Sequence, residues 1–248
     1  MKTVVCIIGS TRSGSTMLDL IISSNPKCAS LGELTLFEKR QCGFCDSDCH
    51  KWEEYKKMVR LPYYYDAAFN VFKKPILVDS SKKWRWLKER VKLEPEYDYK
   101  VIHLVRNGLD RLRFRKKFWG KIEPYVIHGW TRTHNKCEKM RKKHNGVLVR
   151  YEDLGKINII KNLCGYIGID YEPSMRDFWQ HEHHGILGSK TAYSLVRAFH
   201  GLSENTDSFV LEHGFDLKPR TGHKFLDKKD LQIFERHGGL KLNKELGY

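Results

Sequence analysis

The sequence lacks any hydrophobic run long enough to cross a membrane. A transmembrane helix needs roughly 20 consecutive apolar residues, whereas the apolar run after Met1 and Lys2 stops at Gly9. The same run is too short for the apolar core of a secretory signal peptide. We therefore expect no transmembrane segment and a cytoplasmic location.

Acidic residues are also scarce, with 30 Asp and Glu against 45 Lys and Arg, which leaves a formal net charge of +15. This excess suits a nucleic acid, an anionic membrane surface or an acidic small molecule equally well. Zinc-finger spacing, the aromatic signature of an RNA-binding module and the heptads of a basic zipper are all missing. We therefore expect no specific nucleic-acid partner, and we interpret the basic clusters at 106–121 and 132–144 as solvated helix faces.

No repeat or low-complexity tract divides the chain. Its 248 residues, 40% of them hydrophobic, can bury one sizeable core. We predict a single domain over residues 1–248, with insertions near 34–75 and 185–218. Gly, Ser, Asn and His are frequent over 185–220, which indicates loops or a lid rather than core.

Short segments rich in β-branched residues alternate with helical patterns. The predicted strands are residues 4–8, 76–78, 101–105 and 147–149. The predicted helices are residues 52–72, 82–92, 109–119, 122–144 and 227–236, the last capped by Asp227. This alternation is typical of an α/β three-layer sandwich with a central, mainly parallel sheet flanked by helices. Because ligands of such sheets bind beyond the carboxyl ends of the strands, we expect one rim to carry Arg12, residues 79–82, Arg106 and Arg150.

A glycine-bearing loop joins the first strand to a helix, and residues 9–16 read GSTRSGST. Backbone N–H groups in such a loop, together with the positive end of the helix dipole, form a cradle for a phosphate-like group. The spacing matches the phosphate-binding loop G-x-x-x-x-G-K-[ST], except that Ser15 replaces the lysine and Arg12 supplies a cation earlier. Since ATP-hydrolysing loops use that lysine on the transferred phosphate, we predict a different use of the cradle.

Two further segments accompany this loop: residues 101–106 read VIHLVR, and residues 147–154 read VLVRYEDL. The chain ends in Leu-Gly-Tyr. Together these features resemble the sulfotransferases that use 3′-phosphoadenosine 5′-phosphosulfate (PAPS), especially their bacterial and Golgi-type branch. The resemblance covers almost the whole chain. It implies transfer of a sulfuryl group to a hydroxyl or an amine, with PAPS as co-substrate and no required metal.

The resemblance also assigns residues to PAPS. Its 5′-phosphosulfate would lie on the glycine-bearing loop, its 3′-phosphate against Arg106 and a late loop containing His223, and its adenine near Tyr151. The expected nucleotide-binding residues are Arg12, Ser13, Gly14, Ser15, Thr16, Arg106, Tyr151, Arg220 and Lys224.

Three residues are candidates for the chemistry: Arg12, Glu33 and Lys82. Arg12 is placed to stabilise charge on the leaving oxygen. Glu33 ends a possible strand at 29–33. The resemblance to the bacterial and Golgi-type branch implies that a glutamate at this place is the general base. It could equally open a helix at 34–40 and stabilise its N-terminus. Lys82 could reach the sulfuryl group or an anionic acceptor, or lie in the first turn of a solvated helix. His103 and His128 are weaker candidates for the base.

The sequence departs from the resemblance after Arg106. The family usually continues with Asp-Pro and places a serine eight residues after the arginine, whereas this chain continues with Asn107 and Gly108 and has Phe114 at the serine position. One hydroxyl contact to the 3′-phosphate is therefore missing. Since arginine binds phosphate bidentately, three neighbours are candidates to replace it: Arg111, Arg113 and Arg115.

The seven cysteines are an odd number, which argues against a disulfide framework in a cytoplasmic chain. Cys42, Cys45 and Cys49 lie close to His50, and three thiols with one imidazole could complete a tetrahedral zinc site. Structural zinc sites usually combine two separated ligand pairs, whereas these four residues form one compact cluster in the sequence. We therefore assign no metal ligands here. Reduced thiols or a local disulfide are the alternatives.

Three functions follow from these patterns. The first is a PAPS-dependent sulfotransferase acting on a small molecule, a glycan or a lipid head group. The second is a phosphate-loop kinase or nucleotidase that uses ATP and Mg²⁺, for which Asp79 is the obvious acidic strand end. The third is a non-catalytic basic module that binds a polyanion.

Overall fold

The computed structural model describes residues 1–45, 49–186, 188–202, 219, 221 and 226–248. Within these ranges the chain forms one five-stranded sheet in the order β2-β3-β1-β4-β5. All neighbouring strands are parallel. The strands are β1 (Thr3–Gly9), β2 (Cys28–Gly32), β3 (Ile76–Lys82), β4 (Asp98–Val105) and β5 (Val147–Arg150). The predicted α/β fold with a parallel sheet is therefore confirmed.

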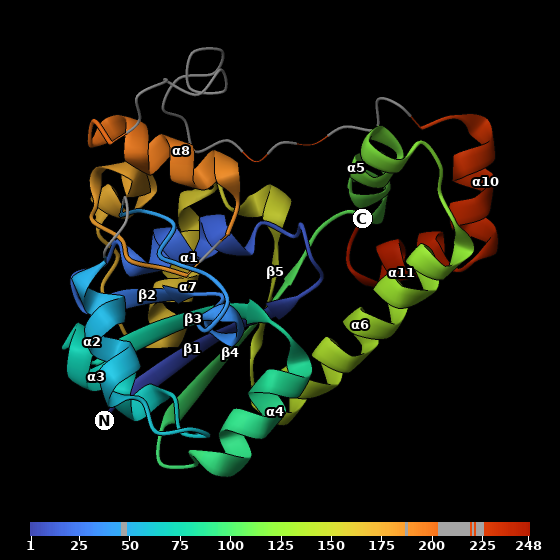
Figure 1. Cartoon of the computed structure of the whole chain (residues 1–248). Helices are drawn as coiled ribbons and strands as arrows, with labels where there is room; N and C mark the ends of the chain where they lie inside the picture. Colours follow the sequence, from blue (N-terminus) through green and yellow to red (C-terminus); the bar gives the residue numbers. More distant parts are fainter. Residues whose placement is uncertain (46–48, 187, 203–218, 220, 222–225) are drawn as a thin grey trace.

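Helices cover both faces of this sheet (Figure 1). Successive side chains of a strand point to opposite faces, so Val5 and Ile7 pack with one helical layer while Val4 packs with the other. The first layer comprises α1 (Ser15–Ser23), α7 (Ile157–Ile167), α8 (Lys190–Phe199) and the 3₁₀ segment η3 (Pro173–Gln180). The second comprises α2 (His50–Met58), α3 (Tyr65–Phe72), α4 (Trp84–Leu93) and part of α6 (Pro124–Lys143).

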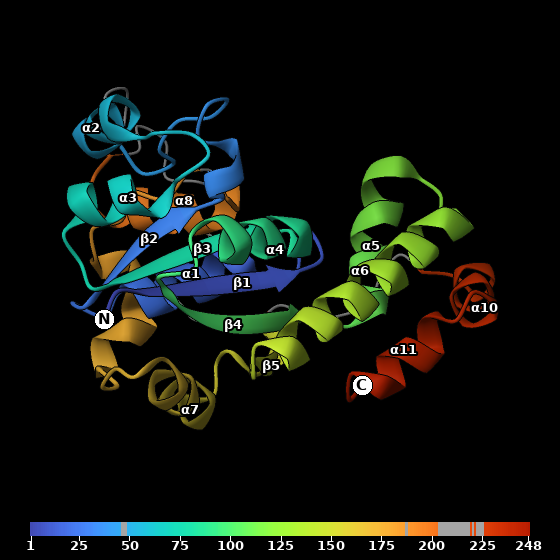
Figure 2. The same ribbon diagram turned by 90° about the horizontal axis from the view of Figure 1, so that it is seen from below.

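A third apolar cluster lies beside the sheet. Figure 2 shows the long helix α6 running from the sheet to this cluster. Met140 of α6 packs in the layer on the sheet, whereas Trp130 of the same helix packs in the third cluster. The other helices of the cluster are α5 (Gly108–Trp119), α10 (Lys228–Arg236) and α11 (Gly239–Glu245). Within the described ranges, no helix combines the length and apolar character that a membrane span requires.

Two predicted helices are wrong in extent. The stretch 52–72 forms two helices, α2 and α3, and Pro62 lies in the connection between them, where its missing N–H would interrupt a helix. The expected helix at 34–40 is only a short 3₁₀ turn, η1 (Leu34–Leu36). The Asp227 cap is confirmed, because its side chain accepts the N–H of Asp230 at 2.9 Å.

Two other expectations are also wrong. Strand β3 does not end at Val78 but continues to Lys82. The region 185–220, expected to form loops, contains α8, whose Ala192, Leu195 and Val196 are buried in the core. Their spacing of three and four residues is that of an apolar helix face.

A buried pair of histidines joins β4 to α6. His103 lies 2.9 Å from His134 (Nε2 to Nδ1) and 3.2 Å from Glu138 (Nδ1 to Oε2). Burial lowers the pKa of His103 to about 4, and burial together with His103 lowers the pKa of His134 to about 3. Both imidazoles are therefore neutral in the folded chain at pH 7.

We expect acid to destabilise the fold through this pair. Histidines of the unfolded chain bind protons near pH 6.5, whereas the folded pair resists protonation until much lower pH. The free energy of unfolding should therefore fall as the pH is lowered from about 6.5 towards 4, which urea unfolding at several pH values will measure. His134→Asn should reduce this slope, and His128→Asn, an exposed change on the same helix, should leave it unaltered. An equal slope in all three proteins would contradict the assignment.

Candidate active site

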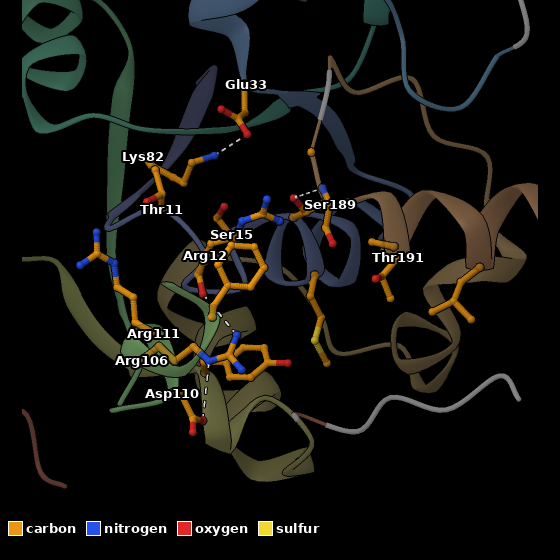
Figure 3. A pocket seen from close by; sticks show the side chains of 18 of the residues that line it. Thr11, Arg12, Ser15, Glu33, Lys82, Arg106, Asp110, Arg111, Ser189 and Thr191 are labelled. Atoms are coloured by element: carbon orange, nitrogen blue, oxygen red, sulfur yellow. Dashed lines mark hydrogen bonds and ion pairs between the residues drawn. The ribbon is translucent and has the colours of Figure 1, made fainter. Parts of the chain in front are cut away.

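A cavity of about 520 Å³ opens at the carboxyl edge of the sheet. Each strand contributes a residue from its end or from the loop that follows it, and some of these side chains are labelled in Figure 3. These residues, in chain order, are Arg12, Glu33, Lys82, Arg106 and Tyr151. The edge at which parallel strands end together is where ligands of such sheets bind, so the cavity is the candidate site.

The loop between β1 and α1 forms one wall of the cavity. Gly14 has φ of +91°, and a Cβ there would lie 2.2 Å from the Tyr151 ring, so only glycine fits. Among the described residues no side chain caps α1, and its first turn carries no acidic residue, which leaves the positive helix end directed at the loop. Gly14, Ser15 and Thr16 line the cavity.

Ser13 belongs to the same loop but does not line the cavity, and it is 1% exposed. Its hydroxyl and that of Ser10 are buried and have no hydrogen-bond partner among the described residues. A buried hydroxyl without a partner is unfavourable. Thr16 is already engaged, because its Oγ1 accepts the N–H of Ser189 at 3.1 Å.

Arg12 packs against Phe114, the residue that stands where the resembling family has a serine. Its guanidinium carbon lies 4.4 Å from the centroid of the Phe114 ring, within the range of a cation–π contact. Arg12 also has φ of +66°, an unusual conformation for a residue with a side chain. Phe114 thus packs against the arginine of the loop.

Arg106 connects the end of β4 to the same loop. Its guanidinium carbon lies 4.2 Å from the centroid of the Tyr151 ring, and its Nη1 donates to the carbonyl oxygen of Arg12 at 3.2 Å. Its Nε lies 3.8 Å from Oδ2 of Asp110. These contacts hold the guanidinium at the cavity wall, where it is half-buried.

Glu33 and Lys82 form an ion pair on another side of the cavity. Lys82 Nζ lies 2.5 Å from Glu33 Oε1, and the two side chains are 11% and 19% exposed respectively. Figure 3 shows both pointing towards each other and away from Arg106. Glu33 does occupy the N-cap position of η1, but its side chain makes no cap hydrogen bond there and pairs with Lys82 instead.

The alternative for Lys82, the first turn of a helix, is wrong. Lys82 is the last residue of β3 and pairs with Ile8 after an irregularity in the register. Its φ is +66°, like that of Arg12. Such a conformation costs about 1–3 kcal/mol for a residue with a side chain. Backbone strain is concentrated at active sites, so its occurrence at these two cavity cations favours a functional role.

The backbone conformation of Gly32 sets the position of Glu33. Its φ is +64°, and a Cβ there would lie 2.3 Å from the carbonyl oxygen of Ile186. That carbonyl accepts the N–H of Glu33 at 2.8 Å, and the N–H of Ile186 donates to Leu31 at 3.0 Å. The segment around Ile186 therefore holds the backbone of Glu33 against the edge of β2.

Positive charge predominates around the cavity. The cationic side chains that line it are Arg12, Lys82, Arg106, Arg111 and Arg113, and the carboxylates are Glu33 and Asp110. Burial and the neighbouring Arg115 lower the pKa of Arg111 to about 10, which still leaves it charged at neutral pH. Arg115 does not line the cavity; its guanidinium lies over the Trp119 ring. The cavity is suited to a ligand with several negative charges.

Other expected rim residues face elsewhere. Asp79 is 2% exposed and accepts hydrogen bonds from the Tyr65 hydroxyl at 2.8 Å and from Trp86 Nε1 at 2.7 Å. Arg150 donates to Asp153 and to the carbonyl of Gly247. Neither side chain lines the cavity, so their expected place on the ligand side of the rim is wrong. Three candidates lie outside the described residues: Arg220, His223 and Lys224.

Helix α8 forms a wall that the sequence analysis missed. Ser189, Thr191, Ala192 and Leu195 line the cavity together with Phe178. The apolar spacing within α8 could have revealed the helix, but nothing in the sequence indicates that it lies beside the phosphate-binding loop.

Comparison with solved structures identifies the architecture. The chain is similar to the sulfotransferase domain from the curacin biosynthetic pathway, with 17% identity, a TM-score of 0.51, and 95% of this chain and 97% of that chain covered. It is also similar to a mouse sulfotransferase solved in complex with PAP (3′-phosphoadenosine 5′-phosphate). The identity is 14% and the TM-score 0.52, with 99% of this chain and 87% of that chain covered. No protein-family model and no curated protein matches the sequence. The chain thus has the sulfotransferase fold.

Replacing Gly32 tests how tightly the site is built. Gly32→Ala combines a left-handed backbone with a collision against the Ile186 carbonyl, whereas Gly120, with φ of +73°, has nothing within 4 Å of its Cβ position. Gly120→Ala should therefore cost about 1–2 kcal/mol of stability from the backbone alone, and Gly32→Ala a further 1–3 kcal/mol, roughly, from overpacking. Urea unfolding measures both, and equal losses would show that the Ile186 segment yields freely.

Proposed function

We propose that the chain is a sulfotransferase that uses PAPS as donor and a hydroxyl or amine as acceptor. The observation that carries this proposal is the cavity itself, which combines an anion-binding loop, a second group of cations at Arg106 and a carboxylate, Glu33, on another side. A donor with phosphate groups at two positions needs the first two features. An acceptor that must lose a proton needs the third.

The cavity residues fit the phosphates of PAPS by charge. The N–H groups at the start of α1 and Arg12 would bind the 5′-phosphosulfate, and the buried hydroxyls of Ser10 and Ser13 are further donors within that loop. Arg106 would bind the 3′-phosphate, with Arg111 and Arg113 supplying the charge that a serine at position 114 does not. Tyr151 would lie near the adenine.

The proposed reaction is an in-line transfer. The acceptor oxygen or nitrogen attacks sulfur, and a new bond to sulfur forms as the bond between sulfur and the bridging phosphate oxygen breaks. The electron pair of the broken bond stays on the 5′-phosphate, where Arg12 and the loop N–H groups stabilise it. Glu33 accepts the proton of the acceptor, and Lys82, paired with it, orients the carboxylate and can contact the sulfuryl oxygens.

The kinase alternative is less well supported. It requires a lysine at the position of Ser15 and an accessible carboxylate for Mg²⁺. Asp79, the residue that the sequence offered for this task, is buried and already accepts hydrogen bonds from two side chains. The non-catalytic alternative leaves the Glu33–Lys82 pair and the strained backbone at Lys82 without a role.

Binding of PAP, the 3′,5′-bisphosphate that remains after PAPS loses its sulfuryl group, tests the donor. We expect metal-free binding at moderate salt, measured by calorimetry, and a loss of about 10- to 100-fold in Arg106→Ala, because one charged hydrogen-bonding partner is removed. Arg115→Ala, a change outside the cavity, should bind normally. Adenosine 5′-phosphosulfate, which lacks the 3′-phosphate, should be barely affected by Arg106→Ala.

Two results would contradict this assignment. Equal weakening of both nucleotides in Arg106→Ala would separate Arg106 from the 3′-phosphate. Binding of ATP that depends on Mg²⁺, without any binding of PAP, would favour the kinase.

Glu33→Gln tests the proposed base. The amide keeps the size of the side chain but cannot accept a proton, so kcat for PAP release from PAPS should fall about 10²- to 10⁴-fold with a panel of phenolic, sugar and amine acceptors. PAP affinity should stay unchanged, since Glu33 lies away from the expected phosphate contacts. Undiminished turnover in this variant would require a different base.

A further inference from the structure

Four side chains of types that commonly bind metal ions meet beside the candidate site. The ligand atoms of Cys42, Cys45, Cys49 and His184 all lie within 4.8 Å of one another. Nδ1 of His184 is 3.4 Å from Cys45 Sγ and 3.3 Å from Cys49 Sγ. The expected imidazole, that of His50, is not part of this group: its ring packs edge-on against the His184 ring with centroids 5.7 Å apart.

We propose that these four side chains bind one zinc ion as a structural Cys₃His site. Zn–S bonds of about 2.3 Å and Zn–N bonds of about 2.0–2.1 Å in a tetrahedron separate the ligand atoms by roughly 3.5–4 Å, close to the separations found here. All seven cysteines are free thiols, so none of the three is consumed by a disulfide. The ligands come from two segments far apart in the chain, a cysteine cluster and one distant histidine, and Cys₃His is a known ligand set of structural zinc sites.

The surroundings of His184 are those of a metal ligand. Its second nitrogen, Nε2, lies 2.9 Å from a carboxylate oxygen of Glu182, an arrangement that orients the ring and leaves Nδ1 for the metal. The backbone carbonyl of His184 accepts a hydrogen bond from Trp52 Nε1. Cys49 stands at the N-cap of α2, where the helix dipole favours a thiolate.

The proposed zinc joins two distant segments that build the wall of the cavity. From the cysteine loop, the N–H of Gly43 donates to the carbonyl of Gly185 at 3.0 Å. Next to it, Ile186 holds the N–H of Glu33. Ser189, slightly further along, donates to Thr16. With four protein ligands the site has no open position for water or substrate, so the zinc positions the cavity wall and takes no part in the reaction. This proposal holds whether or not the cavity transfers sulfuryl groups.

Metal analysis of the full chain tests the proposal. After purification and dialysis against a chelating resin, elemental mass spectrometry should find about one zinc per chain. Replacement with Co²⁺ should produce the intense visible absorption of a tetrahedral site and thiolate-to-cobalt charge-transfer bands. A folded protein without zinc that also fails to bind added Zn²⁺ or Co²⁺ would overturn the proposal, as would a disulfide among the three cysteines.

Variants identify the ligands. His184→Ala should lower the zinc content to below about 0.1 per chain, while His50→Ala and Cys28→Ser, changes at an exposed imidazole and at a buried thiol elsewhere, should retain it. His184→Cys should restore binding by supplying a fourth thiolate, which separates lost coordination from lost folding. Zinc retained in His184→Ala but lost in His50→Ala would contradict the assignment.

Discussion

Parallel pairing of the five strands is the constraint on which the rest of this structure depends. When neighbouring strands run in one direction, their carboxyl ends share an edge, and each strand here delivers one cavity residue to that edge. Residues as distant in sequence as Arg12 and Tyr151 are thereby brought to one cavity, and Gly14 of the loop that carries Arg12 lies against the Tyr151 ring. The helices on both faces keep the sheet buried, as parallel sheets require, and the cavity opens at this edge.

The cations of the cavity are held by aromatic rings and by backbone rather than by acidic partners alone. Arg12 lies over Phe114, and Arg106 lies over Tyr151. An aromatic face attracts a guanidinium without neutralising its charge, so the positive field remains available to an anion. Lys82 differs in that it forms a close ion pair with Glu33, at 2.5 Å, whereas the Arg106 Nε lies 3.8 Å from Asp110. The cavity thus separates a region suited to phosphate from a region suited to proton transfer.

Local patterns predicted much of this arrangement. The loop after β1, the strand that ends before Arg106 and the Asp227 cap all follow from short segments whose chemistry depends on neighbours in sequence. The errors have tertiary causes. Asp79 was expected on the rim, but Tyr65 and Trp86 hydrogen-bond to it from α3 and α4. His50 was expected beside the thiols because it is close in sequence, yet the imidazole that meets them is His184.

The sequence by itself determined the alternation of strands and helices, the anion-binding loop and the identities of Arg12, Glu33, Lys82 and Arg106 as candidate site residues, because hydrophobic period and loop chemistry are local properties. Only the tertiary structure decided that Glu33 pairs with Lys82, that Phe114 packs against Arg12, that α8 borders the cavity, and that His184 meets the three clustered thiols. These contacts join segments far apart in the chain, and their geometry follows from how helices pack on the sheet, which no local pattern encodes.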